Sequence, residues 1–476
     1  MTQTSKPQRV HLIAIGGAGM SAVAKLYLGQ GYEVSGTDRS ASAITAELES
    51  LGAQVTIGHS AQAVSGADTV VVSSAIRADN IELVAAQSQG IRVLHRSEAL
   101  AELMAGYRGI AVAGAHGKTT TSGMIAVGLE QTGAAPSWAI GSSVPGLGAP
   151  SLIGAQSGLG HPFVIEADES DGSFLAYPAE IAVVTNVEAD HLDHYGSEAE
   201  FFAAFGQFLL RLPAGGTAVI CLHDDGARLL ADQIGPELAR RGVSLLTYGQ
   251  LGDGADYEVE ILSVSADNFL EQPIQIYDTA AGLSWPGVVG VPGSHNALNL
   301  TAAWAVLRAL DTEPQDALDG LGKFHGTGRR YELRGKVGGV SVIDDYAHHP
   351  TEVAALLDAA RTAASGRVIA VFQPHLYSRT QNFAERFARA LELADFAAVT
   401  DIYGAREEPL PGVSNRTIAD RFVDSTRHMA ISDPQEAARW AVSMAAPGDT
   451  IFTVGAGDIT QLGARLLDLL SERDSA

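Results

Sequence analysis

The segment with the clearest chemistry is Gly114-Ala115-His116-Gly117-Lys118-Thr119-Thr120, which follows the apolar run 110–113. A glycine turn between a strand and a helix exposes backbone N–H groups, and a lysine with hydroxyl residues at the helix start completes a phosphate cradle. Lys118 is expected to reach the β- and γ-phosphates, and Thr119 to ligate Mg²⁺. The strict long P-loop pattern is not met, because Val112 stands at the position of its first glycine. The segment nevertheless predicts a polyphosphate site.

Two acidic segments follow strands of the same part of the chain. Glu166-Ala167-Asp168-Glu169-Ser170-Asp171 ends one predicted strand, and residues 185–194 end the next. Carboxylates at the carboxyl edge of a parallel sheet, facing a P-loop, are suited to holding Mg²⁺ that bridges phosphates. The pair His191 and His194 also has a spacing found in zinc sites, but no thiolate ligand lies nearby in the sequence, so zinc is the weaker interpretation.

A second glycine turn lies near the N-terminus. Gly17-Ala18-Gly19-Met20-Ser21-Ala22 is a G-x-G-x-x-A sequence that opens a helix after the first strand. A pyrophosphate can bind at such a helix N-terminus. Asp38 ends the second strand 21 residues after Gly17, where an acid can bind a ribose hydroxyl. The pattern predicts a site for a dinucleotide or a UDP-type diphosphate.

The elements that must position these segments alternate between strands and helices along nearly the whole chain, which is typical of βαβ units and a mostly parallel sheet. The sequence therefore predicts an α/β protein of three domains: a Rossmann-like domain at 1–106, a central domain at 107–322 with the parallel sheet of P-loop ATPases, and a Rossmann-like C-terminal domain at 323–476. The predicted strands are 10–15, 33–36, 55–57, 69–73, 93–95, 110–113, 163–167, 181–185, 218–222, 244–248, 341–344, 368–372, 397–401 and 451–454. Residues 256–291 are expected to be rich in β-structure, and helices are expected at 98–104 and 295–310.

The charge balance excludes several classes of partner. The 476 residues include 31 basic and 55 acidic side chains, a formal net charge of −24. Such a surface repels a nucleic-acid backbone and an anionic membrane, so neither is an expected partner. Cys221 is the single cysteine and is expected to be a buried structural thiol in a reducing compartment. No signal-peptide core and no run of 18 apolar residues is seen, so we expect a cytoplasmic protein.

These segments together resemble the Mur ligase family, the ATP-dependent amide-forming enzymes of peptidoglycan assembly. The resemblance extends over all three domains, from about Val10 to Leu470. The segments that carry it are 114–121, 166–171, 185–191, 293–299, 324–332, 344–350 and 373–380. Segments 344–350 and 373–380 are similar to those of the family member that adds the first amino acid.

The resemblance implies a two-step reaction. ATP phosphorylates the lactyl carboxylate of UDP-N-acetylmuramate, and the amine of L-alanine then displaces phosphate to give UDP-N-acetylmuramoyl-L-alanine. Phosphorylation gives the poorly electrophilic carboxylate a leaving group, so the protein has mainly to align reactants and neutralise charge. The expected ligands are ATP, two Mg²⁺ ions, UDP-N-acetylmuramate and L-alanine.

The resemblance also implies roles for individual residues. The catalytic residues would be Lys118, Glu166, His191 and Arg330, of which Glu166 and His191 would bind metal together with Thr119. ATP would be bound by Gly114, Ala115, His116, Gly117, Lys118, Thr119, Thr120, Asn296, Asn299, Arg330 and Asp345. The UDP-sugar would be bound by Gly17, Gly19, Met20, Ser21, Asp38, Ser73, Ser74 and Arg96, and the reacting carboxylate or the amino acid by His348, His375 and Arg379.

Three other functions fit part of the pattern. A recycling ligase that attaches an intact tripeptide to the same UDP-sugar shares the P-loop and a similar Asp-Asp/His-His-Pro segment, but residues 373–380 favour the alanine-adding member. An NAD(P)-dependent oxidoreductase would account for Gly17–Ala22 and Asp38 and leave the P-loop and the third domain without a role. A non-catalytic nucleotide-binding protein would not be expected to retain Lys118, Glu166 and His191 together.

Overall fold

The structure, a computed structural model, describes residues 8–148, 151–189, 192–263, 271–363, 366–405 and 407–474. The chain divides into two compact units. The first unit comprises Met1–Glu260, Ile274–Val288 and Leu298–His325, and the second comprises Ile261–Pro273, Val289–Ala297 and Gly326–Ala476. Three sheets with intervening helices confirm the predicted α/β class. The domain boundaries near residues 106 and 322 stay a prediction.

The first sheet has five parallel strands in the order β3-β2-β1-β4-β5. Because β1 lies between β2 and β4, the loops after β1 and β4 diverge, and such a switch point is where open α/β sheets bind ligands. The strands are β1 Arg9–Ile13, β2 Glu33–Asp38, β3 Gln54–Ile57, β4 Thr69–Val72 and β5 Arg92–His95, and the helices are α1 Ala18–Gly29, α2 Ala43–Ser50, α3 Ile81–Ser88 and α4 Arg96–Leu103. Each predicted strand of this stretch is present, with ends within two residues of those expected.

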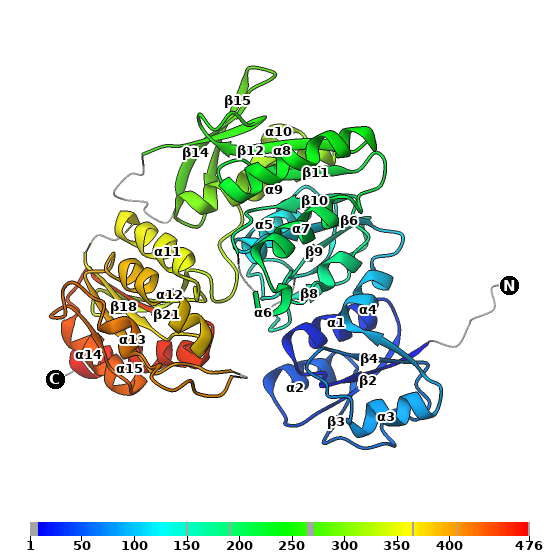
Figure 1. Cartoon of the computed structure of the whole chain (residues 1–476), viewed down its shortest axis with the longest axis horizontal. Coiled ribbons are helices and arrows are strands. Elements are labelled where there is room, and N and C mark those ends of the chain that lie inside the picture. Colours follow the sequence, from blue (N-terminus) through cyan, green and yellow to red (C-terminus); the bar gives the residue numbers. More distant parts are fainter. Residues whose placement is uncertain are drawn as a thin grey trace. The chain divides into compact units, whose positions relative to one another are not determined.

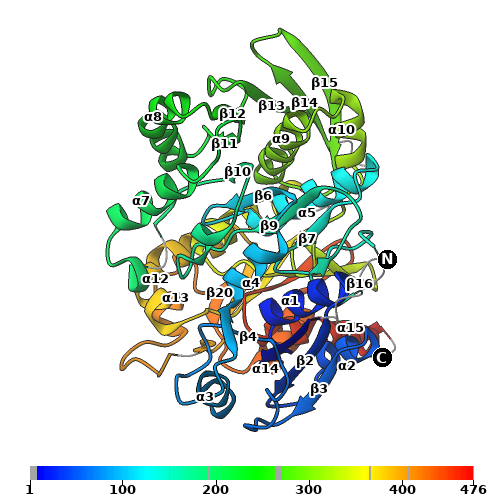
Figure 2. The ribbon, with the colours of Figure 1, turned by 90° about the vertical axis from the view of Figure 1, so that its right-hand side faces the viewer.

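The second sheet has ten strands in the order β15-β14-β13-β12-β11-β10-β6-β9-β7-β8. Its strands are β6 Arg108–Ala113, β7 Ser137–Ala139, β8 Ala155–Gln156, β9 Pro162–Glu166, β10 Ile181–Val184, β11 Thr217–Cys221, β12 Ser244–Gln250, β13 Tyr257–Ile261, β14 Gln272–Asp278 and β15 Leu283–Val289. Figures 1 and 2 both show β14 and β15 as long strands at one edge of this sheet. Strand β6 pairs in parallel with both β10 and β9, so the carboxyl ends of these three strands meet.

Helix α5, Lys118–Gln131, starts directly after the loop that follows β6 and is almost wholly buried. It packs on β9 and against α10. A methyl group at Gly128 would lie 2.9 Å from side-chain atoms of both Leu307 and Leu321, so glycine here allows close packing of α5 against α9 and α10. The other helical elements that accompany this sheet are η1 Ser173–Ala176, α6 Leu192–Tyr195, α7 Glu198–Leu209, α8 Asp225–Arg240, α9 Ser294–Ala309 and α10 Pro314–Leu321.

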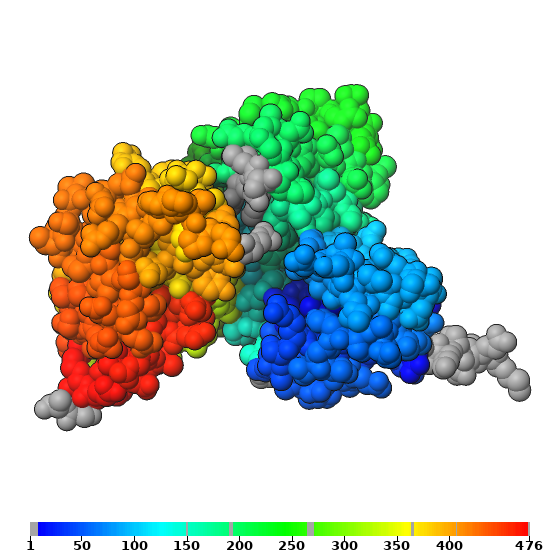
Figure 3. All heavy atoms as spheres, turned by 60° about the horizontal axis from the view of Figure 1, so that its bottom comes forward, coloured from blue at the N-terminus to red at the C-terminus, as the bar shows by residue number. Residues whose placement is uncertain are grey.

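The third sheet has six strands in the order β16-β17-β21-β18-β19-β20. Its strands are β16 Glu332–Val337, β17 Val340–Asp345, β18 Val368–Phe372, β19 Phe396–Val399, β20 His428–Ala430 and β21 Thr450–Val454. Its helices are α11 Pro350–Ala363, α12 Tyr377–Leu391, α13 Arg416–Ala419, α14 Pro434–Met444, η2 Asp458–Gln461 and α15 Leu462–Asp474. In the space-filling view the described residues of this region are coloured yellow to red (Figure 3).

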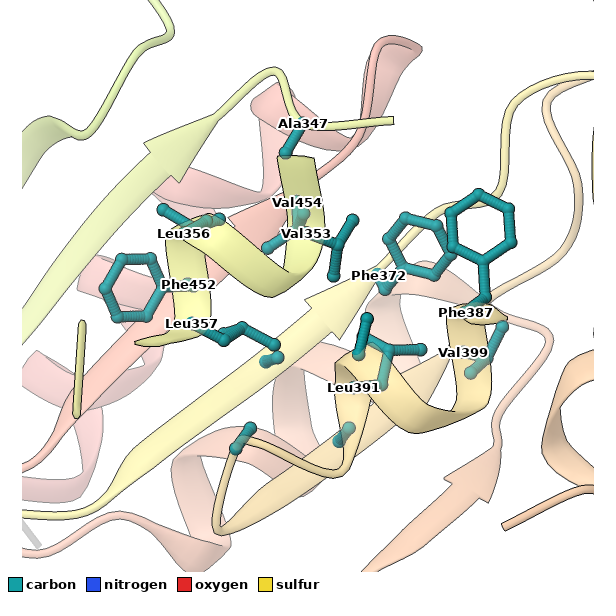
Figure 4. Close-up of a cluster of buried hydrophobic side chains, with 14 of the residues drawn as sticks. Ala347, Val353, Leu356, Leu357, Phe372, Phe387, Leu391, Val399, Phe452 and Val454 are labelled. Atoms are coloured by element: carbon teal, nitrogen blue, oxygen red, sulfur yellow. The ribbon is translucent and has the colours of Figure 1, made fainter. Parts of the chain in front are cut away.

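Two hydrophobic cores lie on the two faces of this third sheet. Successive side chains of a strand point to opposite faces, so Val368, Ala370 and Phe372 of β18 join one core, whereas Ile369 and Val371 join the other. Helices α11 and α12 supply the first core, which Figure 4 shows, and α14 and α15 supply the second. The wholly apolar sequence of β18 follows from its burial on both faces.

The short or polar strands were not predicted from the sequence. Strands β7, β8 and β20 have two or three residues each, too few to show a periodic pattern. Strand β16 is antiparallel to β17, lies at a sheet edge and carries an irregularity between Leu333 and Gly335. One paired side suffices for an edge strand, so its charged sequence is tolerated. Cys221 is 3% exposed, as expected, and burial raises the pKa of its thiol to about 11. Within the ranges that the structure describes, no helix has the length and hydropathy needed to cross a membrane.

Replacement of Leu357, fully buried in the first core of the third sheet, is expected to destabilise the second unit. Leu357→Ala removes buried methyl groups and leaves a cavity, a change that costs about 2–5 kcal/mol. The matched control is Leu333→Ala, at a leucine of the same unit that is 56% exposed. Denaturant titration should show a lowered midpoint for Leu357→Ala and a shift of less than about 1 kcal/mol for the control. Equal shifts would contradict the assigned core.

Candidate nucleotide-binding site

The loop between β6 and α5 has the backbone of a phosphate cradle. Gly114 and Gly117 both have positive φ, +136° and +82°, a region that favours glycine. A methyl group at Gly114 would collide with Thr185 Oγ1, and one at Gly117 would lie 2.7 Å from Asn299 Oδ1. The loop is therefore pressed between two neighbouring elements at positions where only glycine fits. Its N–H groups precede a helix N-terminus, where an anion is stabilised.

Lys118, the first residue of α5, lies in a ring of oxygen atoms. Its Nζ donates to the carbonyl of Gly114 at 2.7 Å and to Glu169 Oε1 at 2.9 Å. The side chains of Lys118 and Glu169 are 13% and 1% exposed. Burial alone would lower the pKa of Lys118, but Glu169, Asp168 and Glu166 outweigh it and raise the pKa, so the ammonium group keeps its proton. Burial, together with the charge of Asp168, raises the pKa of Glu169 to about 7 against the opposing effect of Lys118.

Thr119 and Glu166 form a pair of hard oxygen donors beside Lys118. Thr119 Oγ1 donates to Glu166 Oε1 at 2.8 Å, and Glu166 Oε2 accepts from the backbone N–H of Gly141 at 2.7 Å. Hydroxyl and carboxylate oxygens are ligands that Mg²⁺ prefers, so these two residues fit that ion. His191, the other predicted metal ligand, lies outside the described residues.

The loop after β10 clamps the phosphate loop at His116. Asn186 Oδ1 accepts from the backbone N–H of His116, and Asn186 Nδ2 donates to the backbone carbonyl of the same residue, both at 2.9 Å. Thr185 Oγ1 donates to that carbonyl at 2.6 Å, and the imidazole of His116 lies 3.1 Å from Glu188. Asn186 lies within the segment 185–194 that the sequence singles out, but no role was predicted for it, because a contact 70 residues away leaves no local signal.

The two asparagines predicted to meet the nucleotide base are both buried. Asn299 Oδ1 accepts from Thr121 Oγ1 at 3.2 Å, which places Asn299 under the phosphate loop of the first unit. In the second unit Asn296 Nδ2 donates to the carbonyl of Pro292 at 2.8 Å. Contact of either side chain with a base stays a prediction.

The N-terminal glycine turn presents backbone rather than side chains. Met20 and Ser21 are 3% and 1% exposed, and Ser21 Oγ donates to the carbonyl of Ala18. Asp38 Oδ2 accepts from the N–H of Gly16 at 2.9 Å, so this carboxylate also braces the turn. The guanidinium of Arg96 lies where a methyl group at Gly19 would be, over the start of α1.

Two more predicted residues of this domain follow β4. Ser74 Oγ lies 3.0 Å from Nε2 of His95, the residue that precedes Arg96 in the sequence. The backbone carbonyl of Ser73 accepts from the N–H of Ile76. The structure thus brings together Ser74, Arg96 and the turn after β1.

In the second unit, the predicted residues cluster at the ends of β17 and β18. Asp345 accepts from the N–H groups of Tyr331 and Ala347 at 2.8 and 2.7 Å. Burial raises its pKa to about 6, against the lowering effect of Arg330. Arg330 lies 3.4 Å from Glu352 and over the ring of Tyr346.

The two predicted histidines of this unit lie together. The rings of His348 and His375 are 5.8 Å apart, and His348 Nδ1 lies 3.2 Å from Glu352. Arg379, on α12, is 7% exposed. The neighbouring Arg329 has a different environment from Arg330: its guanidinium donates to Asp344 and to the carbonyls of Gly455 and Gly457, so it braces the fold.

The described geometry defines a class of protein: an α/β fold in which a glycine loop with a lysine begins helix α5, a hydroxyl–carboxylate pair lies beside that lysine, and a second glycine turn follows β1. Sequence comparison places the chain within a family. Residues 9–108 match the Mur ligase family catalytic domain, 112–307 the Mur ligase middle domain, and 329–457 the domain described as Mur ligase, glutamate ligase domain. The chain belongs to the Mur ligase family, whose members form amide bonds at the expense of ATP.

Curated relatives and solved structures make the likeness more specific. A UDP-N-acetylmuramate--L-alanine ligase from Renibacterium salmoninarum is 49% identical over 97% of this chain and 96% of its own length. One from Kineococcus radiotolerans is also 49% identical, over 98% and 97%. The crystal structure of UDP-N-acetylmuramate-alanine ligase from Thermotoga maritima is 27% identical, has a TM-score of 0.79, and covers 98% of this chain and 100% of that one. A murein peptide ligase from Psychrobacter arcticus, 23% identical with a TM-score of 0.67 over 97% and 98%, shares the fold.

Gly117→Ala is expected to abolish ATP binding, because the new methyl group meets Asn299 and distorts the phosphate loop. The matched control is Gly133→Ala, at a glycine with the same φ of +82° but with no atom within 4 Å of the added carbon. Both variants carry the cost of a positive φ, about 1 kcal/mol of stability, and only the first has the collision. Titration calorimetry with an ATP analogue separates them. Native-like ATP affinity in Gly117→Ala would contradict the assigned loop.

The raised pKa of Asp345 predicts a pH-dependent stability difference. The unfolded carboxyl has a pKa near 3.8 and the folded one about 6, so the folded state binds a proton more tightly. The free energy of unfolding of the native protein, relative to Asp345→Asn, should therefore fall as the pH rises from about 4 through 6, by up to about 3 kcal/mol. Denaturant titrations of both proteins at pH 4.5 and 7.5 measure this difference. A difference independent of pH would show that Asp345 titrates normally.

Proposed function

We propose that this protein joins L-alanine to the lactyl carboxylate of UDP-N-acetylmuramate, with ATP converted to ADP and phosphate. The observation that carries the proposal is the phosphate loop with Lys118 held among carboxylates, in a chain whose curated relatives at 49% identity are named for this reaction. The product would be UDP-N-acetylmuramoyl-L-alanine, a precursor of peptidoglycan. A cytoplasmic location fits a reaction that consumes ATP.

The bond changes balance in two steps. A lactyl carboxylate oxygen attacks the γ-phosphorus, and the bond to the ADP oxygen breaks. The alanine nitrogen then attacks the acyl carbon, the bond to phosphate breaks, and the nitrogen loses a proton. Lys118 would neutralise charge on the transferring phosphoryl group, and its raised pKa keeps it charged for that role.

Thr119 and Glu166 would hold Mg²⁺, which supplies charge neutralisation at the phosphates when bound. A second Mg²⁺ with His191 among its ligands belongs to the same proposal. Arg330 would bind phosphate, Asp345 the ribose, and His348, His375 and Arg379 the reacting carboxylate or alanine. Glycines 17 and 19 with Ser74 and Arg96 would bind the UDP diphosphate.

The direct test measures phosphate release from ATP in the presence of Mg²⁺ and UDP-N-acetylmuramate. Three reactions are compared: one with L-alanine, one with the tripeptide and one with no amine. Release that depends on L-alanine is expected. Release that depends on the tripeptide instead would identify a recycling ligase. Bound-NADH fluorescence without any ATPase activity would favour an oxidoreductase.

Lys118→Ala is expected to abolish turnover while UDP-N-acetylmuramate still binds. The lysine lies in the second sheet's phosphate loop, whereas the diphosphate turn follows β1 of the first sheet. Lys336→Ala, at an exposed lysine of β16, is the control and should retain native turnover. Loss of UDP-sugar binding in Lys118→Ala, measured by calorimetry, would contradict this division of the two sites.

Side activity with glycine and serine is also expected. A pocket for a small side chain distinguishes one methyl group by only about 1–3 kcal/mol. Rates with either amino acid should therefore lie within about a thousandfold of the alanine rate under the same conditions. Rates below that limit for both would reject a pocket that selects by fit alone.

A further inference from the structure

Asp171, the last carboxylate of the acidic segment 166–171, is hydrogen-bonded to Ser74, which follows strand β4 of the first sheet. Its Oδ2 accepts from Ser74 Oγ at 3.2 Å, and its Oδ1 accepts from the N–H of Ser173 at 3.0 Å. Ser74 follows β4, and Asp171 follows β9, 97 residues further along the chain. One carboxylate therefore links the segment after β4 of the first sheet to the loop after β9, which contains Glu169.

The hydrogen bonds in this link have a defined direction. Ser74 has a single hydroxyl proton and donates it to Asp171, so its oxygen is left to accept from His95 Nε2; His95 Nδ1 lies 2.8 Å from Ser97 Oγ. The distance between Ser74 Oγ and His95 Nε2 is 3.0 Å, and that between Ser74 Oγ and Asp171 Oδ2 is 3.2 Å. An ionised Asp171 completes this chain. Although burial would raise its pKa, the bonds from Ser173 and Ser74 and the charge of Arg96 lower it.

Arg96 connects the same carboxylate to the N-terminal diphosphate turn. Its guanidinium lies over Gly19 at the start of α1, and its charge also acts on Asp171 and Tyr177. The two sheets are further held together here by packing of α4 against η1. A diphosphate at the turn would compete with Asp171 for the charge of Arg96.

The other end of the segment belongs to the phosphate loop. Glu169, two residues before Asp171, pairs with Lys118, and its backbone carbonyl accepts from the hydroxyl of Tyr195. Gly172 N–H donates to the same carbonyl, which ties the turn that contains Asp171. A change at Asp171 is thus only two residues from the partner of the catalytic lysine.

We propose that Asp171 is a positioning residue that couples the UDP-sugar site to the ATP site through Ser74 and Arg96. The inference rests on the proposed function for the identity of the two ligands. Occupation of the diphosphate turn redistributes the bonds of Asp171, and the segment 166–171 transmits this to Lys118. The coupling is the factor by which the bound UDP-sugar changes the affinity for ATP. Bound ATP must change the affinity for the UDP-sugar by the same factor.

The test measures the affinity of the full-length protein for a non-hydrolysable ATP analogue with Mg²⁺, by calorimetry, with and without saturating UDP-N-acetylmuramate. In the native protein the UDP-sugar should change the affinity at least about fivefold, the lower end of typical couplings. Asp171→Ala should reduce this ratio below about twofold while the affinity for the analogue alone stays within about threefold of native. Ser74→Ala should reduce the ratio as well, and the double variant should show no further reduction.

The control is Asp79→Ala, at an aspartate whose side chain is 74% exposed in the same unit, and it should keep the native ratio. A ratio of one in the native protein, or a native ratio in Asp171→Ala, would overturn the inference. Weakened binding of the analogue by Asp171→Ala without the UDP-sugar would also overturn it, because that result indicates a local structural role. Alanine-dependent phosphate release by the native protein is measured separately, so failure of the proposed function is distinguishable from failure of the coupling.

Discussion

The candidate ATP site depends on the ion pair between the buried ammonium group of Lys118 and Glu169. A buried ammonium group is costly unless it is paired, and here it lies against Glu169 and within reach of two further carboxylates. The pairing keeps the cation where phosphate would bind and leaves it ionised. The same carboxylates would repel a polyphosphate. The proposed binding of ATP would therefore need Mg²⁺ to offset this repulsion, and the oxygen atoms of Thr119 and Glu166 are suitable ligands for that ion.

The backbone around this lysine is fixed from two directions. Thr185 and Asn186 satisfy both backbone groups of His116, while Asn299 lies beneath Gly117. The adjacency of β9, β6 and β10 places these loops side by side, because parallel strands bring their carboxyl ends to one edge. A preorganised loop of this kind presents its N–H groups without further ordering on ligand binding.

The overall acidity of the chain is compatible with the binding of anionic ligands. A net charge of −24 coexists with two proposed polyphosphate ligands because each would be met by a few local cations and backbone N–H groups. Arg96 at the first turn and Lys118 at the second are both balanced by carboxylates of the one segment 166–171. Carboxylates of one segment therefore interact with the cations at both turns, and this is the physical basis of the proposed coupling.

The sequence by itself determined the class of fold and the glycine loop with Lys118, whereas the pair Thr119 and Glu166 was implied by the resemblance to the Mur ligases. The fold class and the loop follow from local signals: apolar runs such as β18, glycines at forced turns, and a lysine at a helix start. Short or edge strands such as β7 and β16 escaped prediction, because three residues show no period and an edge strand tolerates charge.

Only the tertiary structure decided which polar groups meet across long separations. Asn186 clamps a residue 70 positions away, Ser74 donates to Asp171 97 positions away, and Met20 and Ser21 turn inward, leaving backbone at the turn. These hydrogen-bonded pairs cannot be predicted from the local sequence, because the packing of the sheets determines which residues meet. Arg329 and Arg330, adjacent and chemically identical, differ for the same reason: one faces the carbonyls after β21 and the other faces Glu352.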